Sequence, residues 1–228
     1  MNSNVDKNQI NWEDIYSLKK PGNYMNYPSE HLVSLFFQNR AAIRCDGTCL
    51  DYGFGSGNNT EFLIQRMKQI YGLEIATSSL DIIDQRLRHY DNYQPDHFKV
   101  SNDETPFPGG FFDLIVAWQV LCYNDHDSLV SAIAKLDRYL NRDGILICTL
   151  TKQNDVKVQL SEPIAKNTYR VDQRIPHQAG CVVYSPENQS EFLALFSAFR
   201  VIDYGYYERS SLVHENTAAE YYLVAAKK

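Results

Sequence analysis

Long hydrophobic runs are missing from this sequence of 228 residues. The longest apolar stretch, 114–123, is interrupted by Gln119 and is shorter than the roughly 18–20 residues needed to span a bilayer. The first twelve residues are polar and lack the charged-then-apolar order of a signal peptide. These absences predict that the protein has no membrane partner and lies in the cytoplasm.

Paired cysteines and an excess of basic residues are also lacking. The five cysteines are an odd number, show no Cys-x-x-Cys spacing and fall mostly in apolar stretches, as is typical of reduced, buried thiols. No metal site is predicted. The 22 Lys and Arg residues stand against 28 Asp and Glu residues, a net charge of −6, whereas a nucleic-acid-binding protein is expected to carry a basic face. No nucleic-acid partner is predicted either.

Strand-like and helix-like patterns alternate from 48 to 150. This alternation predicts an α/β fold, in which a parallel sheet carries helices on both faces. Two further strands, at about 200–207 and 220–226, are separated only by a loop and are expected to pair as an antiparallel hairpin. The sequence therefore predicts seven strands, mostly parallel, with an antiparallel strand near the C-terminus.

A glycine-rich loop follows the first predicted strand. It reads Asp51-x-Gly53-x-Gly55-x-Gly57 and precedes a helix, so its backbone amides can approach an anionic ligand at the positive end of that helix. The dinucleotide fingerprint Gly-x-Gly-x-x-Gly fits in neither frame, and a Gly-Lys-Ser/Thr phosphate loop is absent. The loop thus predicts a cofactor other than a nicotinamide dinucleotide.

The same residues resemble motif I of the class I S-adenosylmethionine-dependent methyltransferases, and the resemblance extends from about 48 to 150. It implies a Rossmann-like fold and a loop, with Gly53, Gly55 and Gly57, that wraps the methionine and ribose part of the cofactor. Asp51 would orient the loop or the cofactor's ammonium group. Glu74 stands 23 residues after Asp51, next to Ile75, where a carboxylate can accept hydrogen bonds from both ribose hydroxyls.

Two later stretches carry the resemblance further. Residues 101–113 are similar to the adenine-binding stretch of the family, but Ser101 stands where an Asp is usual, so the contact to adenine is left open between Ser101, Asn102 and Asp103. Residues 113–123 resemble the family's fourth strand and the helix after it. The resemblance places Ala117 and Gln119 beside the sulfonium, with Gln119 holding either the methionine part or the substrate.

The family resemblance divides the predicted single domain, 1–228, into four segments. They are an N-terminal arm and helix (1–40), a cofactor-binding core (48–150), an insertion over the active site (151–184), and a C-terminal helix and hairpin (185–228). Tyrosine is abundant, with 16 residues, and several lie in the arm. We expect the arm tyrosines Tyr16, Tyr24 and Tyr27, the last two in particular, to close over the sulfonium, since aromatic faces attract cations. Tyr27 is therefore counted among the cofactor-binding residues.

The methyl acceptor is less defined. Asn-Pro-Pro-Tyr and Pro-Cys signatures of DNA methylation are absent, so a small-molecule acceptor, methylated at oxygen or nitrogen, is predicted. Tyr169 and His177 are candidates for a general base, and Arg170, Arg174 and His177 for acceptor contacts. Two alternatives stay open: a non-catalytic cofactor-binding protein with this fold, and a nucleotide-dependent oxidoreductase. The oligomeric state is not predicted.

Overall fold

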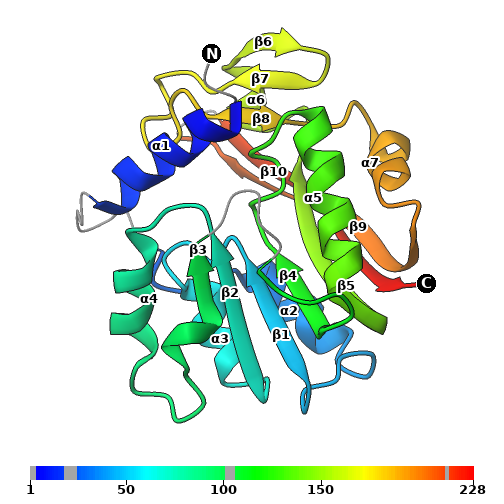
Figure 1. Ribbon diagram of the computed structural model, residues 1–228. Coiled ribbons are helices and arrows are strands. Elements are labelled where there is room, and N and C mark those ends of the chain that lie inside the picture. The colour runs from blue at the N-terminus through cyan, green and yellow to red at the C-terminus, as the bar shows by residue number, and fades with distance from the viewer. Residues whose placement is uncertain (1–3, 18–24, 101–105, 214–215) are drawn as a thin grey trace.

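A computed structural model describes residues 4–17, 25–100, 106–213 and 216–228. Seven strands form one sheet in the order β3-β2-β1-β4-β5-β10-β9, and β10 alone runs opposite in direction to the other six (Figure 1). The strands are β1 (Thr48–Tyr52), β2 (Gln69–Glu74), β3 (Phe98–Val100), β4 (Phe112–Ala117), β5 (Leu140–Thr151), β9 (Phe199–Ser211) and β10 (Asn216–Lys227). The predicted fold class is confirmed.

Helices cover both faces of the sheet because neighbouring strand residues point to opposite sides. In β1, Leu50 belongs to one core cluster and Cys49 to another, and Ile115 and Leu114 of β4 divide in the same way. One face carries α5 and α7, and the other carries α2, α3 and α4. Their bounds are α2 (Glu30–Gln38), α3 (Asn58–Ile64), α4 (Ser79–Leu87), α5 (His126–Tyr139) and α7 (Gln189–Leu195), and a short 3-10 helix, η1 (Pro95–His97), precedes β3.

Regular elements also form in two stretches for which the sequence pattern indicates none. Helix α1 (Asn4–Ser17) occupies the predicted arm. Within the predicted insertion lie α6 (Val156–Gln159) and a three-stranded antiparallel sheet made of β6 (Glu162–Ala165), β7 (Thr168–Arg170) and β8 (Val182–Tyr184). Figure 1 shows α1 beside this small sheet, on the same side of the molecule. Both elements lie beyond one edge of the large sheet.

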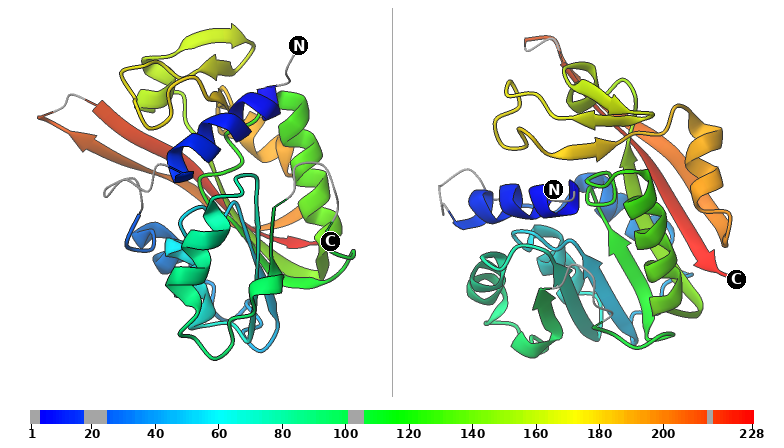
Figure 2. Two further views of the ribbon diagram at one scale, coloured as in Figure 1. Left: turned by 60° about the vertical axis from the view of Figure 1, so that its left-hand side comes forward. Right: turned by 45° about the horizontal axis from the view of Figure 1, so that its top comes forward.

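The terminal hairpin is longer than its sequence pattern predicts. Strands β9 and β10 pair antiparallel from Phe199 with Lys227 to Ser211 with Asn216, and the expected antiparallel pairing is confirmed. Figure 2 shows the hairpin reaching outward past the rest of the sheet. Tyr207 lies opposite Glu220, and Glu220 also pairs with Thr151 at the carboxyl end of β5. The hairpin thereby brings polar residues to the edge where the parallel strands end.

The described residues include no helix that is both long and apolar enough to cross a membrane. All five cysteines are free thiols, and four of them are buried, as their apolar sequence contexts predict. Burial raises the pKa of the buried thiols, Cys122 to about 11, so they pack in the protein as neutral groups.

Candidate functional site

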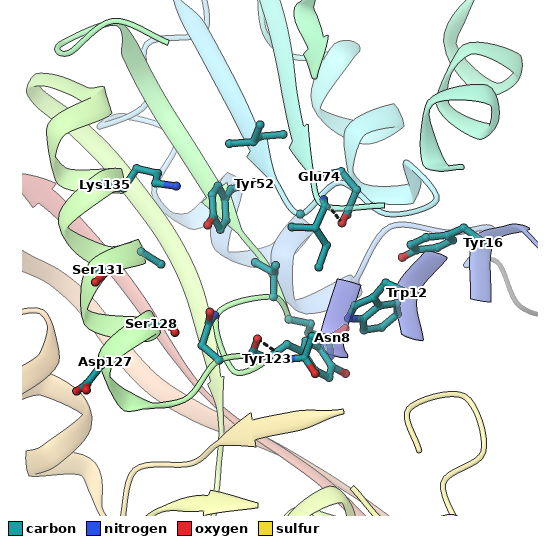
Figure 3. Close-up of a pocket in the computed structure, with 17 residues that line it drawn as sticks. Asn8, Trp12, Tyr16, Tyr52, Glu74, Tyr123, Asp127, Ser128, Ser131 and Lys135 are labelled. Atoms are coloured by element: carbon teal, nitrogen blue, oxygen red, sulfur yellow. Dashed lines mark hydrogen bonds between the residues drawn. The ribbon is translucent and has the colours of Figure 1, made fainter. Parts of the chain in front are cut away.

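A cavity of about 390 Å³ opens at the carboxyl ends of β1, β2 and β4. Open α/β sheets bind their ligands at this edge. The wall comes from five parts of the chain: the end of β1, the end of β2, the residues after β4, one face of α5, and α1 (Figure 3). The cavity lies within the range of volumes, about 300–1,000 Å³, that is usual for small-molecule sites.

The glycine loop has a backbone that other residues rarely adopt. Gly53, Gly55 and Gly57 have φ angles of 77°, 53° and 77°, in the left-handed region that favours glycine. Space is short as well, because a Cβ on Gly53 would lie 2.3 Å from Val120, and one on Gly57 would lie 2.2 Å from Ile83. The loop therefore needs glycine to pack against its neighbours and to leave the cavity open at Gly53, which lines it.

Glu74 ends β2 and lines the cavity with a buried carboxylate. One oxygen accepts a hydrogen bond from the Gly55 amide at 2.9 Å, and the other accepts one from the Ile75 amide at 2.7 Å. Burial raises the pKa of Glu74, and these backbone hydrogen bonds partly oppose that rise. Because a carboxylate has about four acceptor positions, the two oxygens retain acceptor capacity for a ligand.

Asp51 is buried within the structure, and the residues that line the cavity within the described part of the chain do not include it. Its carboxylate accepts a hydrogen bond from the Thr60 hydroxyl at 2.6 Å, which ties the end of β1 to α3. Burial raises the pKa of Asp51 to about 7, the Thr60 hydrogen bond lowers it, and the charge of Glu74 adds to the rise. Of the two roles that the resemblance left open, this geometry supports the one of orienting the loop.

Helix α1 contributes three side chains to the site, of which only Tyr16, one of the arm tyrosines, was expected there from the sequence. Asn8, Trp12 and Tyr16 all line the cavity (Figure 3). They are spaced four residues apart, so a helix brings them to one face, and that spacing is the sequence signal that could have found them. Trp12 stacks on Tyr16 with ring centroids 5.8 Å apart and meets Tyr123 edge-on at 5.0 Å. A Cβ on Gly55 would lie 2.5 Å from the Tyr16 hydroxyl, so α1 sits directly over the glycine loop.

Polar contacts hold α1 in this position. The buried Asn8 amide donates to the carbonyls of Tyr123 (2.8 Å) and Val182 (3.1 Å) and accepts from the Val182 amide (2.8 Å). The Glu13 carboxylate accepts from the Thr77 amide at 2.6 Å, just before α4. The Gln9 side chain donates to the Ile75 carbonyl at 3.1 Å. These contacts join α1 both to the segments that follow β2 and β4 and to β8.

The opposite wall comes from α5. Ser128, Ser131 and Lys135 line the cavity from this helix, next to Tyr52 of β1 (Figure 3). Their spacing of three and then four residues puts them on one helical face. The apolar spacing of this helix indicates packing alone, so these three residues were also missed.

The other residues predicted for the cofactor site are distributed unevenly. Ile75 and Gln119 line the cavity together with Glu74 and Gly53. Ala117 is fully buried in β4, and Tyr27 is 79% exposed; neither is part of the lining. Ser101, Asn102 and Asp103 lie outside the described residues, as does Tyr24.

The structure does not bring the predicted acceptor residues to this cavity. Tyr169 donates a hydrogen bond to Gln153 at 2.8 Å, and Arg174 pairs with Asp172 at 2.7 Å. His177 is exposed, Arg170 is half-buried, and the cavity lining contains no residue from 151–184. Among the described residues, no group of three or more His, Cys, Asp or Glu side chains could hold a metal ion.

Comparisons with known proteins agree with this geometry. The protein family described as "Methyltransferase domain" matches residues 50–148. The fold is similar to that of an S-adenosylmethionine-dependent methyltransferase from Methanosarcina mazei, with a TM-score of 0.68 and 18% identity over 82% of this chain and 95% of that one. It is also similar to the N-methyltransferase NodS from Bradyrhizobium japonicum in complex with S-adenosylhomocysteine, with a TM-score of 0.65 and 18% identity over 97% and 99% of the two chains. At these identities the likeness shows a shared fold.

A curated relative is the non-reducing polyketide synthase ausA from Emericella nidulans, 26% identical over 104 residues. The match covers 42% of this chain and about 4% of the length of that synthase. Residues 50–148 thus match the methyltransferase-domain family, and the fold is shared with S-adenosylmethionine-dependent methyltransferases, in agreement with the family, enzyme class and cofactor that the sequence resemblance implied.

The raised pKa of Asp51 predicts a pH effect on stability. The pKa of Asp51 rises from 3.8 to about 7 on folding, so the folded state holds the proton more tightly than the unfolded state. The protonated carboxyl therefore stabilises the fold at a pH below 3.8, and this stabilisation is lost as the pH rises through about 7. Asp51→Asn removes this loss, so its stability relative to the wild type should increase by about 2 kcal/mol from pH 5 to pH 8. Urea unfolding at both pH values measures it, with the exposed Asp46→Asn as control. Parallel pH curves for the two proteins would contradict the assignment.

Proposed function

We propose that the protein transfers a methyl group from S-adenosylmethionine to the oxygen or nitrogen of a small-molecule acceptor. The observation that carries the proposal is the buried carboxylate of Glu74, which faces a cavity at the end of β2 and is held by the amides of the glycine loop and of Ile75. A buried acceptor group with spare lone pairs suits a pair of ligand hydroxyls. The ribose of the cofactor offers such a pair.

The residues present fit the cofactor. The glycine loop leaves room at Gly53, where a Cβ would collide with Val120, and Glu74 would accept hydrogen bonds from the ribose hydroxyls. Ile75 would pack against the adenine, and Gln119 lies where the resemblance expects the methionine part or the acceptor. When bound, S-adenosylmethionine supplies an electrophilic methyl group on a sulfonium cation.

The protein's own contribution to such a transfer is positioning and the exclusion of water. Helix α1 covers the cavity with Trp12 and Tyr16, and Tyr123 packs edge-on against Trp12. Aromatic faces attract a cation and keep water away from it. Helix α1 therefore takes the role of the lid that we expected of the arm, with Trp12 and Tyr16 in place of Tyr24 and Tyr27.

A small-molecule acceptor is supported by the cavity volume of about 390 Å³ and by the fold that this chain shares with NodS, an N-methyltransferase. The net charge of −6 also favours an acceptor other than nucleic acid. Tyr169, Arg170, Arg174 and His177 lie outside this cavity and stay a prediction for acceptor contacts. The cytoplasmic location and the division into four segments stay predictions as well.

Calorimetry with S-adenosylhomocysteine tests the cofactor site. Glu74→Ala should weaken binding on the order of 100-fold, because it removes hydrogen bonds to a charged acceptor, each worth about 1.5–3 kcal/mol. Glu162→Ala, an exposed residue of β6, is the matched control and should bind as the wild type does. A wild-type protein that does not bind the ligand would overturn the proposal.

Turnover is a separate expectation. Incubating the wild type with S-adenosylmethionine and a panel of small amines, alcohols and phenols should release S-adenosylhomocysteine with at least one of them. Glu74→Ala should lose this release in proportion to its weaker binding. Tight binding without release from any acceptor would favour the non-catalytic alternative.

The lid makes a further prediction. Trp12→Ala should weaken S-adenosylhomocysteine binding about tenfold, since a buried aromatic contact of this kind contributes on the order of 1–2 kcal/mol. Tyr27→Ala should leave the affinity within about twofold of the wild type, because that side chain is 79% exposed and surface substitutions cost little. Calorimetry of both variants decides between α1 and Tyr27 as the aromatic wall, and the reverse order of effects would favour Tyr27.

A further inference from the structure

A polar cluster stands beside the cavity, where the terminal hairpin meets the carboxyl end of β5. Its centre is Glu220, which is 2% exposed. Its carboxylate accepts hydrogen bonds from the Tyr207 hydroxyl at 2.6 Å and from the Gln119 side-chain amide at 3.0 Å, and the Lys157 ammonium lies 3.5 Å away. Of these four residues only Gln119 lines the cavity.

Glu220 determines which end of the Gln119 amide faces the cavity. A carboxylate can only accept hydrogen bonds, so the nitrogen Nε2 of Gln119 must point toward Glu220. The Tyr207 hydroxyl, 3.5 Å from the same nitrogen, lies on that side too. The Gln119 side chain is exposed to the cavity, and its other end is the carbonyl oxygen Oε1.

The surroundings hold this arrangement in place. The Tyr207 ring lies parallel to those of His31, at a centroid distance of 4.0 Å, and Trp118, at 6.1 Å. Burial lowers the pKa of Lys157, but the neighbouring Tyr123, followed by Glu220 and two weaker partners, outweighs this effect and raises the pKa well above its usual value. The Lys157 ammonium lies 3.5 Å from the Glu220 carboxylate, whose two oxygens accept the hydrogen bonds from Tyr207 and Gln119.

The Gln119 backbone is constrained as well. Its φ angle is 56°, in the left-handed region that residues other than glycine seldom adopt. Its amide donates to the Thr149 hydroxyl at 2.8 Å. Such conformations cost free energy and persist where the surrounding structure enforces them, often at functional sites. Backbone and side chain of Gln119 are therefore both held from outside the cavity.

We propose that Glu220 and Tyr207 are positioning residues that orient Gln119, so that its carbonyl oxygen faces the ligand. This inference rests on the proposed function and adds a chemical requirement to it: the ligand group at Gln119 carries an N–H or O–H. The amino group of the cofactor meets this requirement, as does an amine or hydroxyl acceptor. A carboxylate or carbonyl placed there would leave two acceptors facing each other without a hydrogen, which costs binding free energy.

The substitution Glu220→Gln tests the orientation. Glutamine at 220 offers both a donor and an acceptor, so the Gln119 amide can turn its nitrogen toward the cavity. The probes are S-adenosylhomocysteine and 5′-methylthioadenosine, which lacks the amino-acid part. Glu208→Gln is the matched control, because Glu208 is exposed on β9 next to Tyr207 and binds Lys152 and Asn154 instead. Tyr207→Phe is a second variant that removes only the hydroxyl.

Two outcomes support the proposal and identify the ligand group. In the first, Glu220→Gln lowers the affinity for S-adenosylhomocysteine about tenfold and leaves the affinity for 5′-methylthioadenosine unchanged. If Tyr207→Phe shifts the ratio of these two affinities in the same direction, the donor is the amino group of the cofactor. If both affinities hold while the KM of the acceptor found in the panel rises about tenfold at unchanged kcat, the donor belongs to the acceptor.

Other outcomes overturn it. If Glu220→Gln and Glu208→Gln have the same probe affinities and the same KM for the acceptor, Gln119 needs no positioning by Glu220. Equal weakening of both probes together with a lower melting temperature shows that the cluster only stabilises the fold. A wild type that binds neither probe overturns the proposed function and this inference with it. If the wild type binds both probes, the proposed function stands, and the Glu220→Gln and Tyr207→Phe results test the orientation of Gln119 alone.

Discussion

The hydrogen bond from the Gly55 amide to the Glu74 carboxylate joins the ends of β1 and β2 at the point where the cavity opens. Gly55, which donates this bond, has a φ of 53°, a backbone conformation that glycine adopts without strain. The same bond keeps a buried carboxylate satisfied in a place where an unpaired one would be costly. This pairing fixes the glycine loop and the Glu74 carboxylate relative to each other. It also sets the surface that α1 covers, because the Tyr16 hydroxyl lies directly over Gly55.

The central sheet could be predicted from sequence because its signals are local. Apolar strands that alternate with helices, and a glycine loop between β1 and α3, identify a parallel α/β core and its ligand edge. Glu74 followed from its distance along the chain to Asp51. The hairpin followed from two strand patterns with one loop between them, although β9 and β10 extend well beyond those patterns.

The contributions of α1 and of the terminal hairpin to the site could not be predicted, because their contacts join residues far apart in the chain. Asn8 binds Val182, and Gln119 binds Glu220, at separations of 174 and 101 residues. The polar composition of the first segment suggested an arm. Asn8, Trp12 and Tyr16 are spaced as on one helical face, but the polar residues between them obscure this pattern in the sequence. Tyr27 and Tyr16 are the same residue type in the same segment, and they differ in burial, which the sequence does not show.

The docking of α1 through Asn8 has a kinetic consequence. Both partners of the Asn8 side chain, Tyr123 and Val182, belong to much later parts of the chain. Contacts at such separations form late, because a long loop must close before they return any free energy. During synthesis the glycine loop and Glu74 would fold with the cavity still open, and α1 would settle only after β8 has emerged. Ligand retention by α1 is then acquired only after the glycine loop and Glu74 are in place.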